Sequence, residues 1–133
     1  MATRSNIWIQ IDENTFKGIY CHWDGYIESN GEILFNHYND RDKVLKLIQL
    51  GDISSLAENI GTKHDFYKFP EDECNVYHRD REEKYNQFIE NSIDPSILCR
   101  EEYAYLYTLD NEWLVSKYKR KFIPLEKALE KEK

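Results

Sequence analysis

Hydrophobic and polar side chains alternate in two pairs of segments, one pair near each end of the chain. Residues 6–11 carry isoleucine at every second position, and residues 16–22 follow after a short polar connection. Residues 103–107 carry tyrosine at every second position, and residues 113–115 follow a turn at 109–111. A period of two is typical of a strand with two different faces, and a short polar connection favours a hairpin. The pattern therefore predicts two β-hairpins.

Between the hairpins, the spacing of apolar positions changes to three and four residues, which is typical of helices. It predicts short helices at residues 29–38, 39–51, 53–60 and 82–91. A middle strand is expected at residues 74–79, and a helical tail is expected to begin at Pro124. These elements predict an α+β fold. We expect a single antiparallel sheet of about five strands, made of two hairpins plus a middle strand, with short helices between the β blocks and a C-terminal helix.

The length and composition fit one compact domain over residues 1–133. The chain is 41% hydrophobic and 14% aromatic, which is enough to form a core without disulfides. Cys21, Cys74 and Cys99 are an odd number of thiols at long spacings, so we expect reduced cysteines. No apolar run approaches the roughly 20 residues that a membrane-spanning helix needs. We therefore expect a cytoplasmic protein.

Charge is distributed unevenly along the chain. Residues 117–133 form a basic tail with seven basic and three acidic side chains, a net charge of +4. Residues 1–116 hold 11 basic and 22 acidic side chains, a net charge of −11. A body of that sign repels phosphate backbones and anionic membranes, so direct nucleic-acid binding is disfavoured outside the tail. The charge favours a basic protein surface as partner, and it also permits self-association of tail and body.

Two segments place reactive side chains where predicted strands end. His22 and Asp24 lie in the first, and His78 and Arg79 lie in the second. If the two strands are neighbours, the histidines could transfer protons, a carboxylate could orient them, and Arg79 could hold a phosphate or carboxylate. The structural alternative makes the histidines ordinary hydrogen-bonding groups and Asp24 a turn residue, and isolated residues of these types favour that alternative.

No cofactor or metal is expected. Cys74 and His78 share one face of the predicted middle strand, but their spacing does not match a closed zinc site. The chain has no nucleophile elbow, and its scattered glycines do not form a phosphate loop. The lack of catalytic motifs therefore favours a binding function over a catalytic one.

Several short acidic runs accompany the negative body charge. Each is an ordinary solvated surface when taken alone. Together they could form an anionic face that docks on a groove rich in lysine and arginine. The acidic residues expected at this partner-binding face flank the two strand ends and are Asp24, Glu28, Asp40, Asp42, Asp80, Glu82 and Glu83.

The nonapeptide at residues 18–26, Gly-Ile-Tyr-Cys-His-Trp-Asp-Gly-Tyr, resembles a family of small, mostly uncharacterised proteins encoded by bacteriophages and prophages. Supporting similarity lies at residues 34–38, 40–44, 50–56, 77–80 and 102–107. The chain departs from the family's usual sequence at residues 27–31, where the family commonly has a proline and extra glycines. The resemblance implies a phage context, and with it the cytoplasm of a host bacterial cell, and it transfers no activity to individual residues.

These observations lead to one main hypothesis and two alternatives. We expect a phage-encoded, non-enzymatic inhibitor that binds a basic surface of a host or anti-phage defence nucleoprotein, as an anti-CRISPR protein does when it blocks a nucleic-acid site. The first alternative is a small hydrolase or nucleotide-sequestering protein that uses His22, Asp24, His78 and Arg79. The second is a structural role in the virion, which the many aromatic residues permit.

Overall fold

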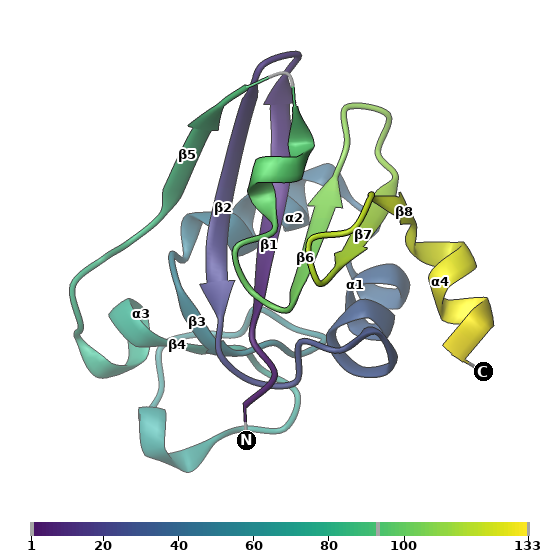
Figure 1. Ribbon diagram of the computed structural model, residues 1–133. Coiled ribbons are helices and arrows are strands. Elements are labelled where there is room, and N and C mark those ends of the chain that lie inside the picture. Colours follow the sequence, from purple (N-terminus) through teal and green to yellow (C-terminus); the bar gives the residue numbers. More distant parts are fainter. Residues whose placement is uncertain (1, 93, 133) are drawn as a thin grey trace.

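A mixed β-sheet forms the centre of the molecule (Figure 1). The computed structural model describes residues 2–92 and 94–132. Its strands are β1 (Ser5–Asp12), β2 (Thr15–Cys21), β3 (Ile53–Ser55), β4 (Asn75–Val76), β5 (Phe88–Asn91), β6 (Tyr103–Tyr107), β7 (Trp113–Lys117) and β8 (Ile123–Pro124). Its α-helices are α1 (Glu32–His37), α2 (Arg41–Gln49), α3 (Tyr77–Arg81) and α4 (Leu125–Glu132). Single turns of π- or 3₁₀-helix are η1 (Ile27–Gly31), η2 (Phe66–Lys68) and η3 (Pro95–Leu98).

The two predicted hairpins are present, but the expectation of a single antiparallel sheet of about five strands is wrong. The strands lie in the order β4-β3-β2-β1-β6-β7-β8, and β5 pairs with β2 next to β3. The two hairpins join through a parallel pair, β1 with β6, and β2 also pairs in parallel with β3. A parallel pair requires a long crossover, and more than 80 residues separate these hairpins along the chain. The alternation within a segment identifies each hairpin but does not show how the two hairpins pair with each other.

Three of the central elements also differ from the prediction. The segment expected as a helix at 53–60 begins with strand β3, because Ile53 pairs with Cys21 on one side and with Val76 on the other. The middle strand expected at 74–79 is only the short β4, after which the chain turns into α3. The helix expected at 82–91 is absent in the structure, and its second half is strand β5 on the edge of β2. Short apolar segments of this kind fit either a strand or a buried helix, and pairing decides between them.

The main core lies between one face of the sheet and the helices α1, α2 and α4. Ile7 and Ile9 of β1 and Tyr105 of β6 are fully buried there. Trp113 donates a hydrogen bond from Nε1 to the carbonyl of Tyr38 at 2.9 Å, which joins the last hairpin to the end of α1. The predicted helices at 29–38 and 39–51 correspond to η1 with α1 and to α2. Their apolar sides cover the sheet, as the spacing predicted.

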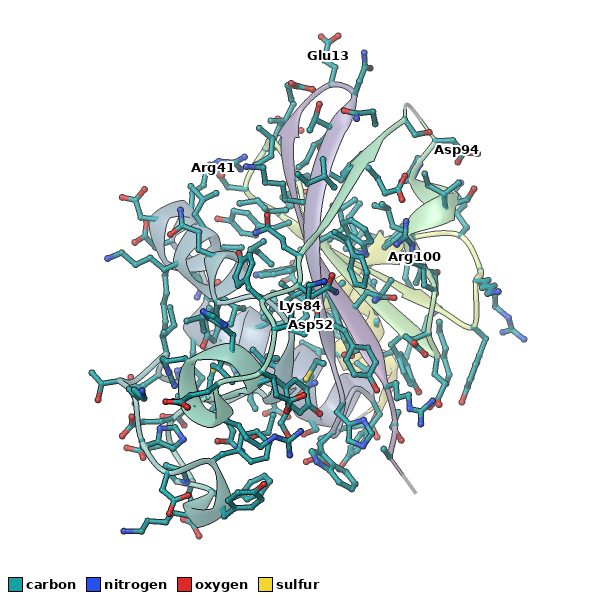
Figure 2. All side chains as sticks on the ribbon, turned by 90° about the vertical axis from the view of Figure 1, so that its left-hand side faces the viewer. Glu13, Arg41, Asp52, Lys84, Asp94 and Arg100 are labelled. Carbon is teal, nitrogen blue, oxygen red and sulfur yellow. The ribbon has the colours of Figure 1, made fainter. Side chains whose placement is uncertain are left out.

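The opposite face of the sheet holds a smaller core around Trp8. Its ring lies directly over Gly18, the residue paired with it in β2, and a Cβ at Gly18 would come within 2.4 Å of the ring. Trp8 also donates from Nε1 to the carbonyl of Leu98 in η3 at 2.9 Å. Figure 2 shows the two faces: Arg41 lies on the helical side of the sheet, and Arg100 lies on the side of the smaller core. Gly18 therefore serves a close packing contact.

The basic tail folds onto the body. Leu125, Ala128 and Leu129 of α4 are buried in the main core, where the helix contacts η1, β7 and α1 (Figure 1). Among residues 2–92 and 94–132, no helix combines the length and the apolar character required to cross a membrane. The packing of α4 thus places Glu126 and Glu130 on the surface beside α1.

Candidate functional site

The two histidines proposed for catalysis do not lie on neighbouring strands. Strand β3 separates β2, which precedes His22, from β4, which precedes His78. His22 hydrogen-bonds through Nδ1 to the hydroxyl of Tyr20 at 2.7 Å. His78 lies in α3, where its Nδ1 hydrogen-bonds to the carbonyl of Glu83 at 2.8 Å. Each histidine has a local partner of its own, and the intervening strand separates the two segments.

Arg79 and Asp80 form a structural ion pair. The Nη1 group of Arg79 donates to the carbonyl of Ile60 at 2.9 Å, and Nη2 donates to the carbonyl of Cys74 at 2.8 Å. The Nε group donates to Asp80 at 2.9 Å, and the side chain of Asp80 is 0% exposed. The guanidinium is therefore occupied by the protein itself. Asp80, expected at an exposed partner-binding face, is instead buried.

Hydrogen bonds determine the ionisation of Asp80. Burial raises its pKa, but the hydrogen bonds from Arg79 and from the backbone N–H groups of Val76 and His64 outweigh burial and hold the pKa below its ordinary value of 3.8. The ionised carboxylate thus joins the loop before η2 to β4 and α3. Its role is to hold these segments together.

The other acidic residues expected at the partner-binding face belong to three separate regions. Asp24 and Glu28 are exposed near η1. Asp40 caps α2 by accepting a hydrogen bond from the N–H of Asp42, which is itself exposed. Glu82 and Glu83 lie at the end of α3 and form ion pairs with Lys63 and Arg81, respectively. Figure 1 shows α3 and α1 on opposite sides of the molecule, so these residues do not form one continuous face.

Cys74 and His78 do not form a metal site. Cys74 is buried, with its Sγ 3.5 Å from the hydroxyl of Tyr38, and burial raises the pKa of the Cys74 thiol. His78 is exposed and bonded to a backbone carbonyl. In the part of the chain that the structure describes, no group of three or more histidine, cysteine, aspartate or glutamate side chains is arranged to hold a metal ion.

A groove along α1 gathers acidic side chains that the sequence analysis largely missed. It consists of three hollows with volumes of about 300, 220 and 360 Å³. The first and second hollows share Glu32 and Asn36, and the second and third share Phe35 and Glu126, so the three adjoin one another along α1. We call this feature the acidic groove and define it by Phe35 and six carboxylates: Glu28, Glu32, Glu58, Glu112, Glu126 and Glu130.

Helix α4 supplies one wall of the acidic groove. Because one side of this helix is buried, Glu126 and Glu130, which are four residues apart, lie on the flank that faces α1. The other wall comes from η1 and α1, and Glu58 closes one end. Phe35 is half-buried at the junction of the second and third hollows, where it offers an apolar surface between the carboxylates.

Few cations balance these carboxylates. Among the described residues that line the three hollows, Lys127 is the one lysine or arginine. His37 lies 3.4 Å from Glu58, and Lys43 donates to the backbone carbonyls of both residues at 2.6 and 2.7 Å. Most of the groove therefore has a negative potential that is not neutralised from within.

Comparison with protein-family models, with curated proteins and with solved structures found no match. A function for this chain must therefore be argued from the site itself. Of the residues expected to bind a partner, Glu28 lies in the acidic groove, and Asp24 lies close to it, since its carbonyl accepts from the N–H of Asn30 in η1 at 3.1 Å. Among the groove residues that the sequence analysis missed, Glu126 and Glu130 had an available sequence signal, which is their i, i+4 spacing.

Proposed function

We propose that this protein is a non-enzymatic inhibitor that holds a lysine- and arginine-rich segment of a host or defence protein in the acidic groove. The observation that carries the proposal is the groove itself, with six carboxylates and one lysine among its lining residues. The phage context comes from the resemblance of residues 18–26 to phage-encoded proteins. Basic segments commonly contact nucleic acid, so a protein that covers one blocks that contact.

The shape and charge of the groove suit an extended basic segment. Carboxylates lie on both walls, so successive basic side chains can pair with Glu32 on one wall and with Glu126 or Glu130 on the other. Phe35 between them offers a surface for the aliphatic stems of lysine and arginine and for cation–π contact. Opposite charge accelerates encounter and selects against acidic partners.

The test is a comparison of two variants with the same net charge. The groove variant carries Glu32→Gln, Glu126→Gln and Glu130→Gln, and the control carries Glu13→Gln, Glu71→Gln and Asp72→Asn, all exposed and outside the groove. The probe is a fluorescein-labelled basic peptide of about 12 residues, measured by anisotropy near physiological salt.

We expect the groove variant to lose at least about 10-fold in affinity and the control to lose less than about 3-fold, because surface charges beyond a Debye length of about 8 Å are screened. Equal losses would mean that the peptide senses only net charge, and the groove would then have no specific role. Circular dichroism of both variants checks that the fold is intact.

The enzymatic alternative predicts that the two histidines are essential, whereas the inhibitor proposal predicts that they are not. Because His22 and His78 each bond within their own segment, a His22→Ala, His78→Ala variant should keep peptide binding and inhibition of phage defence unchanged. Loss of inhibition in a folded double variant would favour catalysis or nucleotide binding instead.

A further inference from the structure

The turn between β7 and β8 is a strongly basic and conformationally strained hairpin. Tyr118 and Lys119 have φ angles of 53° and 64°, and the N–H of Arg120 donates to the carbonyl of Lys117 at 3.1 Å. Two consecutive left-handed residues define a type I′ turn, which usually contains asparagine and glycine. Side chains larger than these cost about 1–2 kcal/mol per residue in that conformation. Strained residues of this kind cluster at functional sites.

Contacts from the body hold this turn in place. Ser116 donates from its hydroxyl to the carbonyl of Arg120 at 2.5 Å, and the N–H of Tyr118 donates to the carbonyl of Glu102 at 2.7 Å. The backbone is therefore fixed, while the ring of Tyr118 is 57% exposed and lies 5.9 Å from the ammonium group of Lys117. The turn presents an aromatic ring together with several cations.

The cations of the turn are half-buried at Lys117 and exposed at the other three positions. We call Lys117, Lys119, Arg120 and Lys121 the basic ridge. Among the side chains that the structure describes, no carboxylate lies within 4.0 Å of a charged nitrogen of the ridge. No described carboxylate therefore neutralises this positive surface through an ion pair.

Two hollows of about 390 and 410 Å³ flank the basic ridge, and both are lined by Arg120 and Lys121. The first has an apolar floor next to α4, formed by Ile27, Val115, Ile123 and Ala128. The second lies beside η3, with apolar lining from Pro95, Leu114 and Phe122. Lys131 adds a further cation to the first hollow, and Asp94 places one carboxylate at the second.

We propose that the basic ridge and its two flanking hollows bind single-stranded nucleic acid. A single strand repeats a flat apolar base and an anionic phosphate at each unit, and the ridge alternates apolar hollows with shared cations in the same way. Two bases of the strand occupy the hollows, which lie on opposite faces of the sheet, and the phosphates between them lie on Arg120 and Lys121 at its edge. Tyr118 stacks on a further base. Aromatic stacking and a cationic path for the backbone are the two means by which proteins hold single strands.

This site is independent of the acidic groove. The groove lies on the flank of α4 that carries Glu126 and Glu130, and the first hollow lies on the flank that carries Lys131. The body's net charge of −11 opposes binding at long range, but screening at physiological salt limits that repulsion to about 8 Å. The ridge therefore acts as a local site on an acidic protein.

The test uses fluorescein-labelled single strands of RNA and DNA of about 10 nucleotides, and the corresponding duplex, measured by anisotropy from about 50 to 200 mM salt. The ridge variant carries Arg120→Gln and Lys121→Gln, and the charge-matched control carries Lys46→Gln and Lys68→Gln, which are exposed elsewhere. Tyr118→Asn removes the ring with a residue that tolerates positive φ.

We expect single strands to bind more tightly than the duplex. The ridge variant should lose at least about 10-fold in affinity, and its log–log salt slope should flatten by about 1.4, as the loss of two phosphate contacts requires. Tyr118→Asn should lose roughly 5- to 150-fold, and the control should change by less than about 3-fold.

Three results would overturn the proposal. One is absence of single-strand binding by the wild-type chain at low salt. Another is an equal loss in the control variant. The third is displacement of the strand by a glutamate-rich peptide of equal charge as effectively as by unlabelled strand, because the ridge would then recognise an acidic protein segment. Groove variants should leave strand binding unchanged, so failure here is distinguishable from failure of the proposed inhibitor function.

Discussion

Replacing Asp80 with asparagine tests whether this residue is structural. One carboxylate oxygen accepts from the N–H of His64 at 3.1 Å and from Nε of Arg79 at 2.9 Å. The other accepts from the N–H of Val76 at 2.8 Å and from Nη2 of Arg79 at 3.1 Å. An asparagine presents one oxygen and one NH₂ group. Whichever way the amide is turned, its NH₂ group faces two donors, so Asp80→Asn leaves one side of the network without an acceptor.

The size of the effect follows from this geometry. Two donors lose their acceptor, at about 1–3 kcal/mol each, and Arg79 loses its counter-charge. Breaking a buried ion pair by removing one partner costs about 3–5 kcal/mol, and we expect a loss in unfolding free energy in that range. For a chain of 133 residues, about 3.6 °C per kcal/mol converts this to a fall in Tm of roughly 11–18 °C.

Urea unfolding followed by tryptophan fluorescence measures the loss. The matched control is Glu82→Gln in the same segment, because Glu82 is exposed and its ion pair with Lys63 at 3.6 Å is worth at most about 1 kcal/mol. A Glu82→Gln variant should therefore unfold close to wild type. If Asp80→Asn changed stability as little as Glu82→Gln, Asp80 would not be part of a structural network.

The same variant has a predictable pH dependence. Because the folded pKa of Asp80 lies below the ordinary value of 3.8, its carboxylate stabilises the native state above that value. The contribution is lost as the pH falls through the lower folded pKa. The difference in unfolding free energy between wild type and Asp80→Asn should shrink as the pH falls below about pH 4. A difference that stayed the same or grew below about pH 4 would contradict the assigned ion pair.

Three further predictions concern packing, backbone strain and thiol reactivity. Gly18→Ala should lower the unfolding free energy by about 1–3 kcal/mol in urea titrations, because its Cβ would meet the ring of Trp8 at 2.4 Å. Lys119→Gly should raise that free energy by about 0.5–1 kcal/mol by the same measurement, since glycine adopts the φ of 64° without strain. Burial raises the pKa of Cys21 to about 12, so a thiol reagent at pH 8 should modify Cys21 slowly unless denaturant is added.

The parts of the fold that the sequence predicted are those defined by neighbours along the chain. Alternation in residues 6–11 and 103–107 identified both hairpins, and the helical spacing at 39–51 identified α2. Strands β3 and β4 have three and two residues, too few for a period to be recognised. Strand β3 depends on pairing with Cys21 in β2, more than 30 residues away, and β4 depends in turn on pairing with β3. The antiparallel assumption failed for the same reason.

The candidate site was predictable to a smaller extent. The sequence indicated a binding role for acidic residues but placed them at strand ends, where Asp80 proves buried and Glu82 and Glu83 lie apart from the rest. The acidic groove depends on the packing of α4 against α1, which brings Glu126 within reach of Glu32 across more than 90 residues of chain. No local pattern contains that adjacency.

Helix α4 carries acidic and basic side chains on different flanks and therefore contributes to both proposed sites. Its residues Glu126 and Glu130 line the acidic groove, and Lys131 on another flank lines a hollow beside the basic ridge. The buried anchors Leu125 and Leu129 fix the helix between them, so the two charges cannot collapse onto each other. A surface that pairs a basic protein segment with an exposed phosphate backbone is characteristic of a nucleoprotein. We therefore expect both proposed sites to bind a nucleoprotein, the acidic groove through its protein and the basic ridge through its nucleic acid.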